Sequence, residues 1–307
     1  MRWLVYITIG LLSACQGIPE QQVDVVAIDD VAEHALPQWQ SPRERKHARL
    51  GQILDTRTGG QLTPAALVSE LAEAPLVLLG EKHDNPDHHA LQLWLIKALA
   101  ARRAQGSVVL EMLTLDQQEA VTQTQKQAQA GALPSDLSAA LNWHKGWDWQ
   151  QYGDLVSHLI QQPYPLLASN LNRAELMEIY RNPPVLKGTA STAPQVTQDL
   201  SEQIREAHCN KLPEAQLPAM LAVQQQRDRS MAKVLLAAPQ PSLLIAGAYH
   251  VRYDLGVPLH ISDLHSDLAD QQRVLIFAEA DQDIKPDSAD FIWYTPAVAE
   301  QDYCADL

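Results

Sequence analysis

The sequence predicts a single α/β domain with a mostly parallel central sheet that is flanked by helices and carries helical insertions. Its 307 residues are 46% hydrophobic, which is enough to build one sizeable core. Five short apolar runs without polar alternation recur along the chain, and stretches of helical character separate them. This pattern is typical of parallel strands that are covered on both faces. The runs are 76–79, 108–110, 165–168, 243–246 and 274–277.

The formal net charge of -14, from 37 acidic and 23 basic side chains, limits the partners of the protein. Nucleic acids are bound through clustered Lys and Arg, and the sequence has no such block. We therefore expect no nucleic-acid partner. The same acidic balance argues against attachment to a membrane through a polybasic surface.

Residues 1–14 are expected to be a signal peptide. Arg2 precedes an apolar run over residues 3–12, which is shorter than the ~20 residues needed to span a bilayer. A transmembrane anchor is therefore not expected here.

Cys15 follows two small residues, and this arrangement resembles the bacterial lipobox, in which the cysteine is lipidated and becomes the new N-terminus. The alternatives are an ordinary secretion signal or a buried strand. Gln16 comes next, and lipoproteins with a residue other than Asp at that place are associated with the outer membrane. We expect a lipid anchor at Cys15 that holds the domain on the periplasmic face of a bacterial outer membrane.

A tether over residues 15–48 is expected to join the lipid to the folded domain, 49–307, because hydrophobic periodicity is weak in this segment. The domain opens with a short strand or hairpin within 51–62. Thr63 and Pro64 then cap and start a helix.

The regions between the apolar runs carry helical patterns. Helices are expected at 86–103, 115–130, 149–162, 173–180 and 213–238. The segment 183–200 is rich in Pro, Ser and Thr, so we expect a long surface loop or lid there.

Cys209 and Cys304 are the two cysteines that remain once Cys15 is assigned to the lipid. An exported protein folds in an oxidising compartment, so we expect a disulfide between them. It would close a loop of roughly 95 residues and so tie the end of the chain to its middle. The alternative is two unpaired thiols.

Polar side chains follow the apolar runs, and ligands of open α/β sheets bind at the carboxyl ends of parallel strands. Glu81 and His83 end the first run, Glu111 ends the second, and His250 follows the fourth. Both His residues belong to a Gly-x-x-His turn, in which Gly permits the tight turn and His can project over the sheet edge. We expect a functional site here; the alternative is a pair of structural histidines.

His88 lies in the first turn of the helix that Asn85 caps and Pro86 begins. A helix N-terminus favours the neutral imidazole, which is the form that binds metals. His88 is therefore a candidate site residue, and an exposed first-turn histidine is the alternative.

Arg227 and Asp228 interrupt the apolar face of the predicted helix 213–238. A buried charge is costly unless it is paired, so we expect Arg227 to meet Glu81 or Glu111. The alternative is an Arg that extends to solvent at the margin of the helix.

These turns, the two Glu residues and the Arg-Asp-x-x-Met-Ala helix together resemble the haem-binding uptake lipoproteins of the ChaN family. That family belongs to a superfamily with the Tiki metalloproteases and the erythromycin esterases. The resemblance runs from about residue 48 to the C-terminus. Its segments include LLGEKHDNPDHHALQLWLI, VVLEM, QQQRDRSMA and AGAYHVRYDLGVPLHI.

The resemblance implies a haem-binding protein of iron uptake, in a dimer that holds two haems face to face. In that arrangement a Tyr ligates each iron, while His and Lys of the partner steady the propionates. Tyr249 and Tyr180 are the candidate iron ligands, with Tyr152 as a further alternative. The candidate ligand-binding residues are His83, His88, His250, Tyr249 and Tyr180.

Two hypotheses of different classes follow. The first is a lipid-anchored haem-binding protein without turnover. The second is a peptidase or esterase in which a divalent metal ion, or an acid and a base without metal, activates water. Its metal ligands would be Glu81, His83, Glu111 and His250, and its catalytic residues Glu81, Glu111, Arg227 and Asp228.

Overall fold

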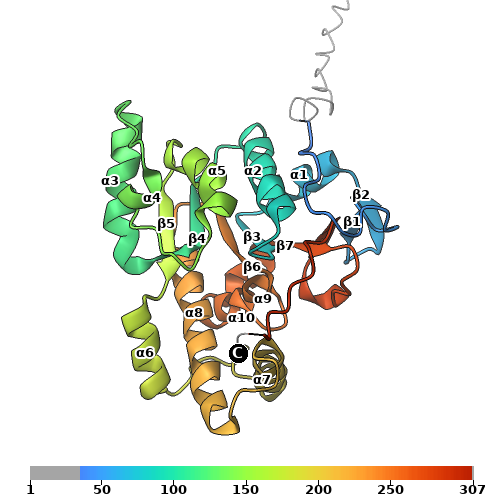
Figure 1. Ribbon diagram of the computed structural model, residues 1–307, viewed down its shortest axis with the longest axis vertical. Coiled ribbons are helices and arrows are strands. Elements are labelled where there is room, and N and C mark those ends of the chain that lie inside the picture. Colours follow the sequence, from blue (N-terminus) through green and yellow to red (C-terminus); the bar gives the residue numbers. More distant parts are fainter. Residues whose placement is uncertain (1–34, 306–307) are drawn as a thin grey trace, which may run out of the picture.

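The computed structural model describes residues 35–305, which form an eight-stranded sheet with helices on both faces (Figure 1). The signal peptide, Cys15 and Gln16 lie outside the described residues. Within 35–305, no helix is long and apolar enough to cross a membrane. The strands are β1 (Ile53–Asp55), β2 (Gly60–Leu62), β3 (Leu76–Glu81), β4 (Ser107–Thr114), β5 (Leu166–Asn170), β6 (Ser242–Gly247), β7 (Gln272–Glu279) and β8 (Phe291–Thr295).

The strand order is β2-β1-β8-β7-β3-β6-β4-β5. All neighbours from β8 to β5 are parallel, and only β1 runs in the opposite direction, antiparallel to both β2 and β8. The predicted α/β class is confirmed, and the five apolar runs are the strands β3 to β7. Each of them is almost wholly buried, as expected for strands covered on both faces.

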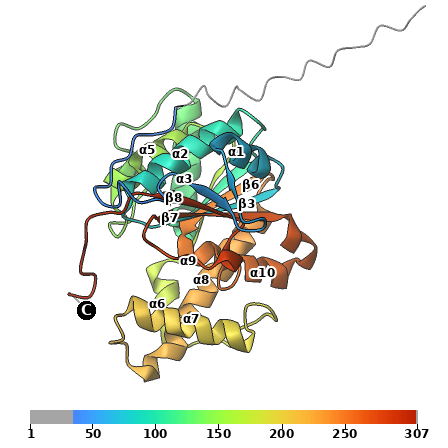
Figure 2. The same ribbon diagram turned by 90° about the vertical axis from the view of Figure 1, so that its right-hand side faces the viewer.

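Helices cover the two faces of the sheet in separate groups (Figure 2). The longer helices are α1 (Pro64–Ala72), α2 (Pro86–Ala100), α3 (Gln118–Gln129), α5 (Trp149–Ile160), α6 (Arg173–Arg181), α7 (Pro194–Ala207), α8 (Leu217–Ala237) and α10 (Val257–Leu264). The short ones are α4 (Leu137–Ala140) and α9 (Ala248–Val251). Val77 and Leu79 of β3 pack in the core with α1, α2, α3 and α5, whereas Leu76 and Leu78 pack with α8 and α10. Alternation along one strand thus builds two cores.

The helix α3 also closes one edge of the sheet. The Gln118 side chain accepts a hydrogen bond from the amide of Ala168 (2.7 Å) and donates one to the carbonyl of Leu166 (3.2 Å). Gln125 accepts from the amide of Leu166 (3.0 Å). Side-chain amides of α3 therefore bind backbone groups of the edge strand β5. A further strand would otherwise form hydrogen bonds with these groups.

The predicted tether and the predicted loop have different bounds in the structure. The expected tether is shorter, because the amides of Gln40 and Ser41 donate to the Asp87 carboxylate (2.7 and 2.9 Å) and Arg43 pairs with Ala297. The domain therefore begins before residue 48. The loop expected at 183–200 ends at Pro194, which takes the first turn of α7 and places Leu200 in an apolar cluster.

The strand β8 was not among the predicted runs. Its five residues are all buried and pair with β7 on one side and β1 on the other. After β8, Cys304 forms a disulfide with Cys209, and their Cα atoms lie 5.8 Å apart.

Candidate functional site

The carboxyl ends of β3, β4 and β6 meet at one edge of the sheet. Glu81 at the end of β3 lies in register with Gly247 at the end of β6, and Glu111 of β4 accepts a hydrogen bond from the Gly247 amide (2.8 Å). The structure therefore brings the two predicted Glu residues and both Gly-x-x-His turns together. They form two clusters, one around each Glu.

Glu111 is buried and paired with cations. Its Oε1 atom lies 2.6 Å from the Arg227 guanidinium and 3.2 Å from Nε2 of His250. Arg227 also donates from Nε to Asn170 (3.2 Å), so α8, β4 and the end of β5 are linked. Burial alone would raise the pKa of Glu111, but His250 and Arg227 outweigh it and hold that pKa well below its ordinary value. Glu111 is therefore a carboxylate at neutral pH.

His250 lies between two carboxylates. Its Nε2 atom contacts Glu111, and Nδ1 forms a short hydrogen bond with Asp228 of α8. Burial opposes the charge, yet Glu111 and Asp228 raise the pKa of His250 to about 9. His250 is therefore an imidazolium at neutral pH, and neither ring nitrogen offers a lone pair to a ligand.

The second cluster is centred on Glu81, whose side chain is fully buried. Its Oε1 atom accepts hydrogen bonds from Tyr152 (2.8 Å) and from Nδ1 of His83 (2.8 Å). The His83 side chain is 41% exposed. Burial would lower the pKa of His83, but the hydrogen bond and charge of Glu81 raise it.

Gly247 gives the His83 ring its space. A Cβ at this position would lie 2.8 Å from both Cε1 and Nε2 of His83, which is closer than such contacts allow. Gly247, at the end of β6, is therefore required for the position of the His83 ring after β3. The two Gly-x-x-His turns are packed on each other.

The predicted metal site is wrong. Within residues 35–305, no group of three or more His, Cys, Asp and Glu side chains could hold a metal ion. Glu111 is engaged by Arg227 and the Gly247 amide, and His250 is held by two carboxylates. The cluster of Glu81, His83, Glu111 and His250 therefore compensates its charges internally.

His88 is a structural residue, contrary to the prediction. It is fully buried, and its Nδ1 atom accepts a hydrogen bond from the Lys82 amide (2.9 Å) while Nε2 contacts the Thr295 hydroxyl (2.9 Å). Burial keeps its pKa well below the ordinary value. Both nitrogens are used to fix the loop after β3 against β8.

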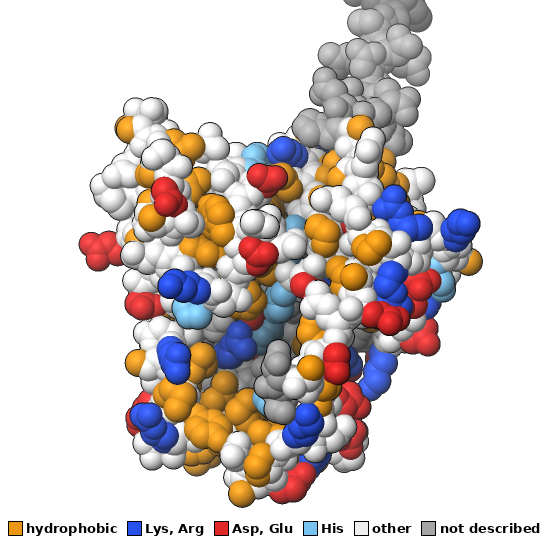
Figure 3. All heavy atoms as spheres, viewed as in Figure 1, with side chains coloured by type: hydrophobic (Ala, Val, Ile, Leu, Met, Phe, Trp, Pro, Cys, Tyr) orange, Lys and Arg blue, Asp and Glu red, His pale blue; other side chains and the backbone are white. Residues whose placement is uncertain are grey.

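A cavity of about 780 Å³ opens beside these clusters. Figure 3 shows a hollow on this face with His (pale blue) and Lys or Arg (blue) side chains in it. Polar lining residues include His83, His250, Lys82, Arg252, Lys285, Tyr249 and Tyr303, and apolar ones include Ile276, Phe277 and Ile284. The volume lies within the range of about 300–1,000 Å³ that is usual for small-molecule sites.

The two tyrosines of the cavity are both largely exposed, Tyr249 to 51% and Tyr303 to 55%. The Arg252 guanidinium lies 5.8 Å from the Tyr249 ring centroid. Tyr180, on α6, does not line the cavity, and Tyr152 is buried behind Glu81. Sequence reasoning missed Tyr303, although its place next to Cys304 could have indicated it once the disulfide was expected.

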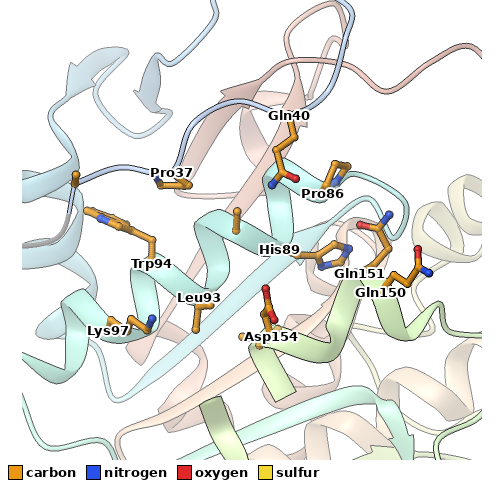
Figure 4. A pocket seen from close by; sticks show the side chains of 13 residues that line it. Pro37, Gln40, Pro86, His89, Leu93, Trp94, Lys97, Gln150, Gln151 and Asp154 are labelled. Atoms are coloured by element: carbon orange, nitrogen blue, oxygen red, sulfur yellow. The ribbon is translucent and has the colours of Figure 1, made fainter. Parts of the chain in front are cut away.

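A second cavity of about 380 Å³ lies between α2 and α5, and residues near Pro37 and Gln40 border it (Figure 4). His89 lines it and also approaches the site, with Nε2 3.0 Å from the His83 carbonyl. His89 thus braces the loop after β3 from behind.

The family model for haem-binding uptake proteins of the Tiki superfamily, ChaN, matches residues 67–261. The chain belongs to the ChaN family. Among solved structures it is similar to ChaN of Campylobacter jejuni, a protein described with cofacial haem binding. The identity is 31% and the TM-score 0.70, over 78% of this chain and 95% of that one. The family predicted from sequence is confirmed.

More distant structures share far less with this ChaN-family chain. An erythromycin esterase has 13% identity and a TM-score of 0.42, over 78% of this chain and 77% of its own. A Bacillus cereus protein has 11% identity and a TM-score of 0.40, over 73% and 72%. No curated protein matches the chain significantly.

Proposed function

We propose that this protein binds haem in the 780 Å³ cavity and serves haem or iron uptake as a lipid-anchored protein on the periplasmic face of the outer membrane. The observation that carries the haem proposal is the combination, in one cavity, of an exposed Tyr, three cations and an apolar floor. Family membership and the cofacial haem binding described for the Campylobacter jejuni relative support it.

The residues present fit haem. A ferric porphyrin needs an anionic oxygen or similar ligand, apolar contacts for the ring and cations for its propionates. Ala248 and Ile284, which are partly exposed, offer apolar contacts. Lys82, Arg252 and Lys285 offer cations, of which Lys82 and Arg252 also pair with carboxylates of this chain. When bound, haem supplies a ferric iron that hard oxygen ligands stabilise.

Tyr249 is the proposed iron ligand. Its phenol is exposed at the cavity, and the Arg252 guanidinium, which also pairs with Asp254, lies beside the ring. His83 is the proposed histidine of the site, since its raised pKa and its exposure at the cavity suit an anionic propionate. His250 supports the site from within, because both of its nitrogens are occupied.

A hemin titration of the purified chain from residue 35 tests this proposal. We expect a Soret shift that saturates at about one haem per chain, with an affinity in the micromolar range or better. Tyr249→Phe should remove the tyrosinate charge-transfer band and weaken binding at least tenfold. Tyr180→Phe is the matched control and should leave both unchanged. Wild-type spectra without any hemin-dependent change would reject the haem site.

The anchor and the location are proposed from residues 1–16, whose lipobox-like arrangement ends at Cys15. Metabolic labelling with a fatty acid should mark the full-length protein and not Cys15→Ser, and fractionation should find the label in the outer membrane. A Cys15→Ser variant that still carries label would contradict the anchor.

A homodimer is proposed because haem is bound cofacially in the relative. Light scattering with and without hemin tests it, and a mass of one chain under both conditions would count against it.

A second candidate, hydrolysis without metal, rests on the His83–Glu81 pair. Glu81 holds Nδ1 of His83, so Nε2 could take a proton from water while the water oxygen adds to an ester carbonyl; the departing alkoxide would then receive that proton. Turnover of a p-nitrophenyl ester that His83→Ala abolishes would support this candidate, and equal rates in both proteins would exclude it.

A further inference from the structure

The last residues of the described chain have no regular secondary structure, and Tyr303 among them lines the cavity. The backbone is anchored up to Val298, whose amide donates to Glu279 (2.9 Å). Residues 300–303 are exposed. The next fixed point is the disulfide from Cys304 to Cys209, which lies just beyond α7 (Figure 1). Lys211, in the same turn as Cys209, also donates to the carbonyl of Cys304 (3.0 Å).

Tyr303 joins this segment to the loop that carries the site. Its hydroxyl donates a short hydrogen bond to Asp84, and the Lys82 ammonium lies 5.6 Å from the centre of its ring. Lys82 in turn forms an ion pair with Asp84 (3.4 Å). The segment is therefore held at its start by Glu279 and at its end by two neighbouring residues: Tyr303 binds the loop after β3, and Cys304 is bonded to Cys209 after α7. Tyr303 lines the cavity.

We propose that residues 299–305 form a strap that the Cys209–Cys304 disulfide holds across the cavity, and that Tyr303 is the aromatic wall this strap presents to a flat ligand. The inference rests on the proposed haem site for the identity of the ligand. The position of the strap itself does not depend on that ligand.

The chemistry of Tyr303 suits a wall rather than an iron ligand. Burial and the hydrogen bond to Asp84 raise the pKa of Tyr303, so its phenol stays protonated at neutral pH. A neutral ring can stack on a planar aromatic system. Tyr303 and Tyr249 thus differ in role, although both are exposed at the same cavity.

Hydrogen exchange on the haem-free protein tests the strap independently of haem. In a Cys209→Ser/Cys304→Ser variant, the amides of residues 82–85 and 300–305 should exchange at least tenfold faster, while β5 amides report global stability. Tyr303→Ala keeps the disulfide, so it can be measured if the double variant does not fold. The Tyr303→Ala variant should speed hydrogen exchange only at residues 82–85.

Hemin dissociation tests the wall. Tyr303→Ala and the double Ser variant should release hemin about tenfold faster, as expected for the loss of one aromatic contact, and Tyr303→Phe should stay within about threefold of wild type. Tyr180→Ala, outside the cavity, should not change the rate.

Wild-type dissociation rates in Tyr303→Ala, together with unchanged exchange at residues 82–85, would overturn the strap while leaving haem binding intact. A wild-type protein that binds no hemin would refute the proposed function and the wall, and the exchange experiment would then decide the strap alone.

Discussion

The pairing of Arg227 with Glu111 explains why a helix that faces the core carries a guanidinium. Both groups are largely buried, and Arg227 lies 2.6 Å from a carboxylate that has little contact with water. Removing one partner of such a pair leaves an uncompensated charge, which typically costs about 3–5 kcal/mol.

We therefore expect Arg227→Ala to lower the free energy of unfolding by about 3 kcal/mol or more. Arg205→Ala is the matched control, because Arg205 pairs with Glu214 at the surface, where solvent screens the pair, so its loss should change stability far less. Urea denaturation measures both. Equal losses in the two variants would show that Arg227 is solvated rather than buried in a pair.

The charge on His250 predicts a pH dependence of stability. The pKa is raised from 6.5 to about 9 on folding, so the charged ring stabilises the fold fully below pH 6.5 and this contribution is lost as pH rises through 9. The contribution is about 3 kcal/mol at most. Chemical denaturation from pH 6 to 10 should show the loss in wild type and a flatter profile in His250→Gln.

Gly247 packs so closely against His83 that the contact has no room for an additional methyl group. Gly247→Ala would place Cβ 2.8 Å from the His83 ring and force that ring to move. We expect this variant to fold and to change the pKa of His83, which histidine NMR titration measures. An unshifted His83 resonance would show that the ring has room to spare.

At the scale of elements, the segment around Ser41 behaves as part of the domain. The Asp87 carboxylate, in the first turn of α2, accepts two backbone amides from it, so the segment depends on one side chain. We expect Asp87→Ala to speed hydrogen exchange at Gln40 and Ser41 by at least tenfold. Asp136→Ala, which removes the cap of the exposed α4, should leave these amides unchanged.

The elements also show what sequence could and could not predict. The five short apolar runs and their polar ends were found because burial on both faces leaves a clear pattern. The strand β8 was missed, although its five residues are all buried. The segment 35–48 and the role of His88 depend on tertiary contacts, such as those with Asp87 and with Thr295, and no periodicity records those.

The site was predicted in position and not in chemistry. Glu81, His83, Glu111, Arg227 and His250 do meet, because strand ends converge at one edge of the sheet. The pairing of Arg227 with Glu111, one of its two predicted partners, is present. Residue types alone could not reveal that two carboxylates charge His250. Metal sites and ion-pair networks contain the same types of residue, and only the distances between the side-chain atoms distinguish the two.

For the whole molecule, the disulfide closes a long loop, because its cysteines are 95 positions apart in the sequence. Chain-entropy estimates give about 4 to 5 kcal/mol for such a loop. We expect the Cys209→Ser/Cys304→Ser variant to lose up to that amount in urea denaturation, with Asp302→Asn as a control that keeps the bond. A loss below about 1 kcal/mol would mean that the unfolded chain is already compact.

The glutamines of α3 bear on how copies of this protein can associate. Gln118 and Gln125 occupy backbone groups of β5, the last strand on that side, as a neighbouring strand would. An occupied edge offers no template for strand addition, so this border is protected against edge-to-edge aggregation and against a continuous intermolecular sheet. A haem-bridged pair would therefore have to form through side chains around the cavity, and its assembly could be controlled by ligand supply instead of by strand pairing.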